Sequence, residues 1–299
     1  MNNLNELHLK FANIDSILSN QWIQREILHQ AKKAQIVNKD LEVKVYLHLP
    51  RFTFDELRQE TIVKNEIVRL AETIKINYQE SNLSYLNDDY SSLPIENLIV
   101  EPVNGEIVNV LLGKLHFLNS IRENSINLGL KEIKNGRILG VISFSSFDLF
   151  HIDTSPFLHE EVKILSRLFT INKLSRNMLS RFIKLAKSWL SNNLPEIKLL
   201  LTYLNPNVGY RGTIYKATNW KIYAREHNVR YVYLNGNYVT DRFLYKTFGT
   251  ANSEKLKEIG ASDITFSKIK LHPLIIYACR TNNEDLEIDS IQDTYIERS

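Results

Sequence analysis

Glycine occurs in only part of this 299-residue sequence. All ten glycines lie at Gly105 or later. Glycine makes up about 7% of average proteins and supplies the positive φ angles that many tight turns require. The 104 residues before the first glycine are instead rich in Leu, Ile, Glu, Lys and Asn. We therefore expect residues 1–94 to form a mainly helical N-terminal module, distinct from the rest of the chain.

Apolar spacing gives a more detailed prediction for this module. Residues 41–49 (LEVKVYLHL) alternate between apolar and polar, which predicts a strand that ends at Pro50. Residues 54–76 predict one long helix, and the polar, acidic residues 77–94 predict a linker. A first helix is indicated by an apolar stripe at helical spacing: Trp22, Ile23, Ile27 and Leu28.

From residue 95 onward, short β-branched runs alternate with helical patterns. Residues 175–190 form an amphipathic helix between the second and third of these runs, and a crossover of this length favours a parallel strand pair. We expect an α/β (α+β) class, with a mixed central sheet flanked by helices over residues 95–282. The predicted strands are residues 138–144, 162–171, 197–204, 229–234 and 272–279.

Charge is unevenly distributed along the chain. Residues 1–100 carry a net charge of −3, residues 101–282 carry +11, and residues 283–299 carry −5. The basic middle region indicates a polyanionic partner such as nucleic acid or a phosphorylated cofactor, or else solvated surface lysines. We expect the acidic tail of residues 283–299 to be flexible.

Composition also bears on compartment and association. The one cysteine, Cys279, excludes an intramolecular disulfide, and no run of 18 apolar residues occurs. The N-terminus lacks the basic and apolar regions of a signal peptide. The sequence thus predicts a cytoplasmic protein with no membrane association. Formation of a homo-oligomer is left open.

The segment 162–195 is a candidate phosphate site. It contains seven basic residues and no acidic one, in the order strand, polar turn, helix. The helix begins near Ser175–Arg176–Asn177, and helix N-termini attract phosphate through unpaired N–H groups and the helix dipole. The turn has no glycine, so it is neither a Walker loop nor a dinucleotide fingerprint. The alternative is a capped surface helix with a basic face.

A second candidate segment is residues 202–220. Gly209 and Gly212 follow a predicted strand and lead into a helix that begins near Thr213. Tyr215 and Asn219 lie four residues apart, on one face of that helix. A tyrosine at a ligand site can act as a general acid, although many such residues only pack and hydrogen-bond at the tip.

Taken together, these residues resemble the Mom-type phage DNA-modification proteins, which belong to the GNAT-like acyltransferase superfamily. The resemblance covers residues 95–280, approximately, and includes His116–Phe117, residues 125–129 (SINLG) and Phe248–Gly249–Thr250. Its most specific part is the motif IYxAxNW, with Arg and Arg-Asn-x-x-Ser elements upstream. The residues that carry it are Arg167, Ser175–Arg176–Asn177, Ser180, Tyr203, Asn205, Gly209–Tyr210, Gly212, Tyr215, Ala217 and Asn219–Trp220.

The resemblance implies an enzyme that uses acetyl-CoA to add a carbamoylmethyl group to N6 of adenine in DNA, which protects the DNA from restriction. It also implies iron as a further cofactor. Arg167, Ser180 and Tyr215 correspond to essential family residues. By the same analogy, Ser175 to Ser180 would hold the CoA pyrophosphate, and Tyr215 would protonate the leaving CoA thiolate.

Three positions depart from the family pattern. Asn205 replaces an aspartate, Tyr210 replaces a histidine, and Phe117 replaces a tyrosine. Asparagine cannot act as a base and is a poor metal ligand. None of the eight histidines shows HExxH or HxH spacing, although His116 and His151 could meet in space.

The sequence therefore yields three sets of candidate site residues; the metal ligands remain unknown. The catalytic candidates are Arg167, Tyr215, Asn205 and His116. The candidates for acyl-CoA binding are Leu168, Ser175, Arg176, Asn177, Ser180 and Asn219. The candidates for DNA binding are Tyr210, Lys216, Trp220, Lys221 and Arg242.

Three functions are consistent with these residues. The first is acyl-CoA-dependent modification of DNA adenine. The second is acyl transfer by the same fold to another acceptor, such as RNA, protein or a small-molecule amine. The third is a non-catalytic nucleic-acid-binding protein on the same scaffold, which the departures at Asn205 and Tyr210 motivate.

Overall fold

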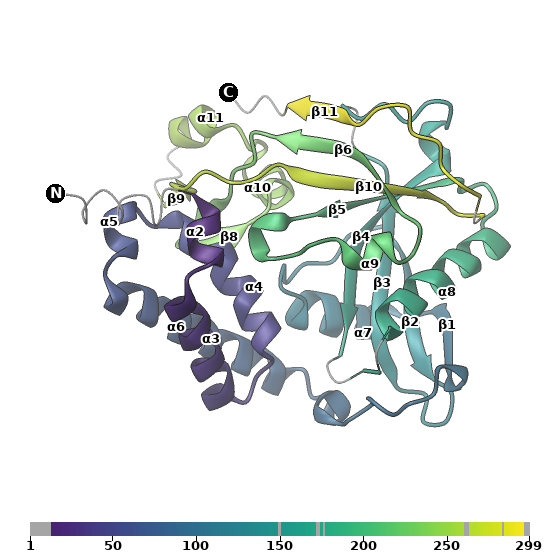
Figure 1. Cartoon of the computed structure of the whole chain (residues 1–299), viewed down its shortest axis with the longest axis horizontal. Helices are drawn as coiled ribbons and strands as arrows, with labels where there is room; N and C mark the ends of the chain where they lie inside the picture. Colours follow the sequence, from purple (N-terminus) through teal and green to yellow (C-terminus); the bar gives the residue numbers. More distant parts are fainter. Residues whose placement is uncertain are drawn as a thin grey trace.

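The computed structural model describes residues 13–148, 151–171, 174–175, 177–259, 263–282 and 284–295, with the side chain of Asn87 left out. Its centre is an eight-stranded mixed sheet in the order β1-β2-β3-β4-β5-β10-β6-β11 (Figure 1). The strands are β1 (Leu98–Pro102), β2 (Ile126–Glu132), β3 (Ile138–Ser146), β4 (Val162–Thr170), β5 (Leu199–Leu204), β6 (Lys221–His227), β10 (Leu274–Arg280) and β11 (Gln292–Tyr295). The predicted mixed α/β class with a helical N-terminal region is confirmed.

The parallel pair predicted from the sequence is β4 and β5, connected by α8 (Met178–Asn193). The other neighbouring strands run antiparallel, except that β11 is parallel to β6. A second sheet, β8-β7-β9, consists of β7 (Val232–Leu234), β8 (Asn237–Val239) and β9 (Ile264–Phe266). The predicted strand 229–234 thus shrinks to β7 and belongs to this smaller sheet.

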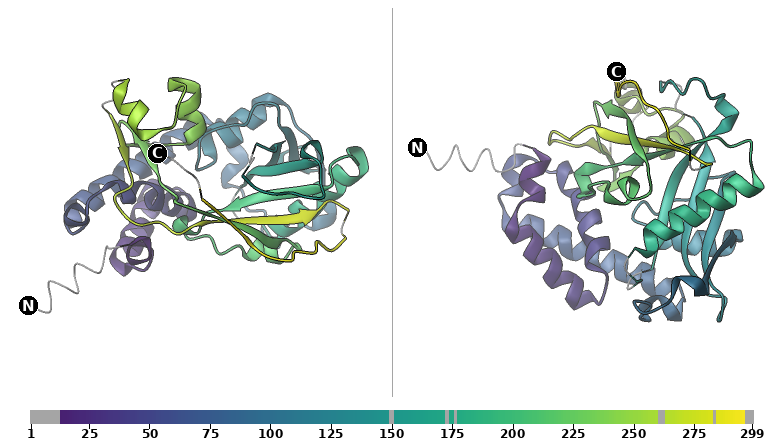
Figure 2. Two further views of the ribbon diagram at one scale, coloured as in Figure 1. Left: turned by 90° about the horizontal axis from the view of Figure 1, so that it is seen from above. Right: turned by 45° about the vertical axis from the view of Figure 1, so that its right-hand side comes forward.

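Five helices form the N-terminal module: α2 (Ile14–Leu18), α3 (Gln21–Ala34), α4 (Asn38–His48), α5 (Phe54–Leu57) and α6 (Glu60–Glu80). Figure 2 shows them grouped at one end of the molecule, beside the sheet. Their buried apolar residues form one cluster with Val208, Tyr231 and Tyr233 from the later part of the chain. The module therefore shares its hydrophobic core with the region that follows it.

The predicted strand at residues 41–49 is wrong, because these residues lie in helix α4 and the short helix η1 (Leu49–Arg51). Helix α4 contacts α3 and α6 on one side and η6 (Pro206–Val208) and β8 on the other. Burial on two sides places apolar residues around the helix, including Val43, Val45 and Leu47. The resulting alternation imitates the pattern of a strand.

Three other N-terminal predictions need correction. The long helix at residues 54–76 is two helices, because α5 ends at Leu57 and α6 begins at Glu60. Leu28 is 58% exposed, so it lies outside the buried stripe of α3. Residues 77–94 are not a linker: they contain the end of α6 and the short helix η2 (Ser84–Asn87), and both Leu86 and Tyr90 are buried in the main core.

The acidic C-terminal tail is partly ordered, against expectation. Strand β11 extends the edge of the large sheet, where Thr294 Oγ1 donates a hydrogen bond of 3.1 Å to the carbonyl of Arg225. His227 Nε2 lies 2.8 Å from Asp293 Oδ1 in the same strand pair. A charged edge strand of this kind closes the sheet on one side.

The remaining helices are short and flank the two sheets. None of the described helices is long and apolar enough to cross a membrane. They are η3 (Ile95–Asn97), α7 (Gly105–Val108), the π-helix η4 (Asn109–Leu115), η5 (His159–Glu161), α9 (Thr213–Lys216), α10 (Asp241–Phe248) and α11 (Ser253–Glu258).

Candidate functional site

The central feature of the site is the divergence of β4 and β5. Their parallel pairing ends at Leu165 and Thr202, and the Thr202 hydroxyl donates a hydrogen bond of 3.0 Å to the carbonyl of Leu165. Beyond this rung β4 continues to Thr170 while paired only with β3. One backbone edge of β4 is thereby left without a strand partner. Free N–H and C=O groups on such an edge can hydrogen-bond an extended ligand.

A cleft of about 640 Å³ opens at this divergence. Its volume lies within the range of about 300–1,000 Å³ that is usual for small-molecule sites. Six sequence candidates line it: Arg167, Leu168, Tyr215, Asn205, His116 and Tyr210. These residues come from β4, η4, α9 and the loop after β5, so the fold brings together segments that are far apart in the sequence.

Tyr215 lies at the floor of the cleft. The turn at Gly212 (φ +69°) leads into α9 and directs Tyr215 inward, where it is 8% exposed. Its hydroxyl lies 3.4 Å from Thr202 Oγ1, and its ring contacts Tyr277 at a centroid distance of 5.3 Å. Burial raises the pKa of Tyr215 above its usual value of 10. The phenol therefore stays protonated at neutral pH and can only donate a proton.

Arg167 is a buried cation on β4. Its guanidinium donates to three neutral oxygens: Ser120 O (3.1 Å), Ser120 Oγ (2.8 Å) and Ser166 O (2.6 Å). Within the described residues no ion pair joins it to a carboxylate. Burial, and then the charge of Arg122, lower the pKa of Arg167 to about 10, so it remains charged at neutral pH. A buried cation without a counterion favours an anion or a developing negative charge in the cleft.

His116 is 5% exposed beside Arg167. The backbone N–H of Leu118 donates to its Nδ1 (3.2 Å), so the neutral ring carries its proton on Nε2. Burial, and then the charges of Arg167 and Lys44, hold the pKa of His116 well below 6.5. The ring is thus a neutral hydrogen-bond donor at neutral pH. His151 does not line the cleft and lies 3.4 Å from Glu226.

Asn205 and Tyr210 lie on the acceptor side of the same cleft, near the N-terminal module. The Asn205 side chain accepts hydrogen bonds from the N–H and the side-chain amide of Asn207 and donates to Tyr231 Oη (2.9 Å). Its amide therefore holds the loop after β5 in place. Tyr210 packs edge-on against Phe117, with 6.1 Å between ring centroids.

The candidate phosphate site lies at the start of α8. Asn177 (φ +67°) precedes the helix and makes no side-chain cap, whereas α3, α10 and α11 are each capped by an Asn or Thr side chain. The Ser180 hydroxyl donates back to Asn177 O (2.8 Å). Leu179, in the first turn, lines the cleft together with Thr170. The first N–H groups of a sixteen-residue helix thus point toward one end of the cleft without a side-chain acceptor.

The other cofactor candidates are more dispersed. Ser175 is half-buried just before α8, and its carbonyl accepts the N–H of Met178. Arg176 lies outside the described residues. Asn219 follows α9 with φ +61°, and it is exposed and does not line the cleft.

The predicted DNA contacts separate into two groups. Lys216, Lys221 and Arg242 lie at the surface, where Lys221 pairs with Asp285 (2.7 Å) and Arg242 with Asp148 (2.9 Å). Trp220 is 3% exposed and packs against Tyr215, with 5.5 Å between ring centroids. A side chain buried to this extent cannot reach DNA, so the indole belongs to the core beneath the cleft.

The N-terminal module supplies site residues that sequence reasoning missed. Lys39, Asp40 and Leu47 of helix α4 line the cleft. Burial raises the pKa of Asp40, even though Tyr78 donates a hydrogen bond to its carboxylate and Lys44 lies nearby. The polar pair at positions 39 and 40 was the available signal, but the strand prediction for the adjacent residues concealed it.

The described residues do not provide an iron site. Nowhere among them do three or more His, Cys, Asp or Glu side chains gather in a group that could hold a metal ion. The donors present in the cleft therefore do not fit the iron that the resemblance implies, and none of the steps considered below uses a metal.

The geometry described so far defines a mixed α/β protein with a ligand cleft between two diverging parallel strands. The chain belongs to the Mom protein family, whose model matches residues 97–292. This confirms the resemblance. A search of curated proteins found no match.

Solved structures with partial similarity are acetyltransferases. Ribosomal-protein-S5-alanine acetyltransferase from Vibrio fischeri shares 8% identity over 64% of this chain and 97% of its own, with a TM-score of 0.35. A GNAT family acetyltransferase from Elizabethkingia anophelis with bound acetyl-CoA shares 12% identity over 62% and 99%, with a TM-score of 0.36. Spermidine N-acetyltransferase from Vibrio cholerae, in complex with CoA and spermine, shares 4% over 62% and 97%, with a TM-score of 0.37.

Proposed function

We propose that this protein is an acyl-CoA-dependent transferase that modifies the N6 amino group of adenine in DNA by carbamoylmethylation, which would protect the DNA from restriction. Membership of the Mom family supports acyl transfer. The observation that carries the proposal is the cleft between β4 and β5, with an uncapped helix N-terminus at one end and a protonated tyrosine at its floor.

The chain's own residues suit an acyl-CoA ligand. The unpaired edge of β4 can hydrogen-bond the amide groups of an extended pantetheine chain. The N–H groups at the start of α8 suit a pyrophosphate, with Ser175 and Ser180 beside them. When bound, acyl-CoA supplies an activated thioester.

Three side chains would then act at the reacting centre. Tyr215, kept protonated by burial, would donate its proton to a departing thiolate. Arg167 would stabilise the negative charge that develops during acyl transfer, because it has no counterion of its own among the described residues. His116 would donate a hydrogen bond from Nε2 to the same region. We assign Asn205 a positioning role, through Asn207 and Tyr231.

DNA would approach over the basic surface. We retain Tyr210, Lys216, Lys221 and Arg242 as proposed contacts and remove Trp220, because its side chain is buried. Phosphate contacts of this type release counterions, so binding should weaken steeply as salt is raised.

The test is nucleoside mass spectrometry of DNA from cells that express the full chain, the Arg167→Ala variant or an Arg25→Ala control. Arg25 is exposed on α3, where its side chain bonds only to its own helix. We expect a heavier adenosine with the wild type and the control and none with Arg167→Ala. Removal of Arg167 leaves no carboxylate unpaired, so the variant should fold. Wild-type modification by Arg167→Ala would refute the assignment.

DNA that stays unmodified by the wild type would favour the other two functions. Calorimetry with CoA separates them: an acyltransferase acting on RNA, protein or small-molecule amines binds CoA, whereas a non-catalytic nucleic-acid-binding protein binds DNA alone. The amide at position 205 is the observation that keeps the non-catalytic function in view, because it removes a base from the cleft.

A further inference from the structure

A second cavity adjoins the cleft. It has a volume of about 330 Å³, and we call it the chamber. Four side chains line both cavities, so only they separate the two spaces: Leu47, Phe117, Leu118 and Tyr238. Its size suits one flat ring or one side chain, at the lower end of the usual range for ligand sites.

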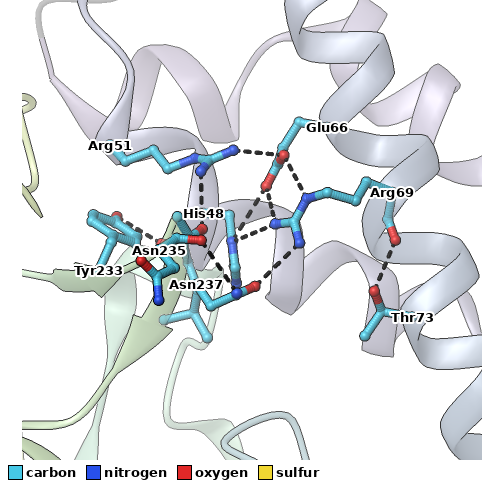
Figure 3. Close-up of polar contacts among 10 residues, drawn as sticks. His48, Arg51, Glu66, Arg69, Thr73, Tyr233, Asn235 and Asn237 are labelled. Atoms are coloured by element: carbon cyan, nitrogen blue, oxygen red, sulfur yellow. Dashed lines mark hydrogen bonds and ion pairs between the residues drawn. The ribbon is translucent and has the colours of Figure 1, made fainter. Parts of the chain in front are cut away.

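The chamber lies between the N-terminal module and the smaller sheet. Lys44 and His48 of α4 and Arg69 of α6 form one wall, and Asn237 of β8 is part of the other. A buried carboxylate, Glu66, joins the two sides (Figure 3). Arg69 binds Glu66 Oε1 at 2.7 Å and also donates to Asn237 Oδ1 at 3.1 Å. The walls are therefore fixed before any ligand arrives.

Charge in the chamber is one-sided. Its lining contains the cations Lys44 and Arg69 and no Asp or Glu. Glu66 neutralises Arg69, whereas the Lys44 ammonium donates to the side-chain oxygen of Asn119 and forms no ion pair among the described residues. Asp40, one turn earlier on α4, lies on the cleft side and is bonded by Tyr78. Such a lining repels an alkylammonium group and favours a neutral acceptor that offers lone pairs.

The chamber also offers aromatic surfaces. Phe117 and Tyr238 stand at the boundary with the cleft, and Phe243 of α10 lines the chamber while 43% exposed. Aromatic side chains stack on any nucleobase, and they contribute most where the base has left its own stack. The combination of a donor cation, no carboxylate and three rings matches a nucleobase better than it matches a lysine or polyamine.

We propose that the chamber is the acceptor site, in which a nucleobase stacks on Phe117, Tyr238 and Phe243 while Lys44 of the N-terminal module donates a hydrogen bond to its edge. The inference rests on the proposed function and gives residues 1–94 a part in it: they form half of the acceptor site. From the chamber, an exocyclic amine needs to pass only the Phe117–Tyr238 boundary to face Arg167 and Tyr215 in the cleft.

The behaviour of Lys44 supports this role. Burial, and then the charge of Arg69, lower its pKa to about 8. The ammonium therefore remains the main form at neutral pH but is less strongly held in that form than a surface lysine. It is a hydrogen-bond donor on a helix, and Asn119 fixes its position.

The experiment measures binding of a single-stranded oligonucleotide that carries one 2-aminopurine, whose fluorescence falls on stacking, to the purified full chain. Two variant pairs are compared. Phe243→Ala is matched by Tyr245→Ala, which removes a 60%-exposed ring from the same helix but outside the chamber. Lys44→Met is matched by Lys64→Met, an exposed lysine on α6. Calorimetry with CoA is run on all of them.

We expect about tenfold weaker oligonucleotide binding for Phe243→Ala, in line with the usual contribution of one stacked base, and a similar loss for Lys44→Met. Both controls should bind as the wild type does, and CoA affinity should stay within about twofold throughout. Phe243 is exposed, so its variant tests the inference even if Lys44→Met unfolds.

Two results would overturn the inference. One is unchanged oligonucleotide binding by Phe243→Ala and by a folded Lys44→Met. The other is displacement of the oligonucleotide from the chamber by spermidine at micromolar concentration, which would show that the site accepts cations. Because binding needs no turnover, a wild type that leaves DNA unmodified but shows the expected variant pattern refutes the proposed reaction and upholds the chamber.

Discussion

Replacement of Glu66 by glutamine tests the network that joins the N-terminal module to the smaller sheet. The Glu66 carboxylate is 4% exposed and accepts from Arg51 (2.7 Å) and from Arg69 (2.7 and 3.0 Å), with His48 Nδ1 at 3.3 Å (Figure 3). Arg51 also donates to the carbonyl of Gly236 in the turn before β8. A glutamine keeps the shape of this side chain but leaves two guanidinium groups without a counter-charge.

The magnitude follows from two independent estimates. Burial alone would raise the pKa of Glu66, but hydrogen bonds from His48 and Arg69 and the charge of Arg51 outweigh it and lower the pKa from 4.5 to about 2. A carboxyl with this shift contributes about 3 kcal/mol to the free energy of unfolding at neutral pH. Breaking a buried ion pair at one partner costs about 3–5 kcal/mol. We therefore expect Glu66→Gln to lose about 3 kcal/mol.

The dependence on pH has a definite sign. The folded-state pKa lies below the unfolded value, so the stabilisation is complete above pH 4.5 and is lost as the pH falls from there toward 2. The difference between Glu66→Gln and the wild type should shrink to less than half at pH 3. Urea unfolding followed by tryptophan fluorescence at pH 7 and pH 3 measures it.

Glu72→Gln provides the matched control, because Glu72 lies on the same helix, is 57% exposed and meets Lys75 only at 3.9 Å. Its expected cost is below about 0.5 kcal/mol. A loss of less than about 1 kcal/mol for Glu66→Gln at pH 7 would refute the reasoning. So would a loss that is the same at both pH values.

Two further variants test the cleft. Gly212→Ala should destabilise the protein by more than about 1 kcal/mol in urea, because φ is +69° and the new Cβ would lie 2.5 Å from Tyr277 Oη, whereas Gly113→Ala, with nothing within 4 Å, should not. Tyr215→Phe should leave the melting temperature within about 2 °C and lower the rate of DNA modification about 10²–10⁴-fold. An unchanged rate would remove Tyr215 as proton donor.

Much of the large sheet could be predicted from the sequence because its strands are buried runs of β-branched and aliphatic residues. Residues 138–144 and 162–171 match β3 and β4 closely, and α8 supplies the parallel crossover between β4 and β5. The pattern is local there: each strand is buried on both faces, so its own residues report its structure.

The N-terminal prediction failed where burial depends on distant partners. Helix α4 is enclosed by α3 and α6 on one side and by residues near 207 and 238 on the other. No local pattern encodes those partners. The same limit hid the chamber, because Lys44, Phe117 and Phe243 come from three separate parts of the chain. Motif spacing located the cleft, whose residues follow β4 and β5, but it could not locate an acceptor site built across the module boundary.

The amide at position 205 illustrates how a family departure can preserve structure. Asn205 Oδ1 accepts from Asn207, and Nδ2 donates to Tyr231 Oη. A carboxylate there would keep the first bonds, and the Tyr231 hydroxyl, 3.2 Å from Oδ1, could turn its proton toward the second oxygen. Either residue therefore satisfies the same partners. What differs is the charge opposite Arg167 in the cleft: an aspartate would partly neutralise that cation, whereas asparagine leaves it unpaired and free to act on the substrate's developing negative charge.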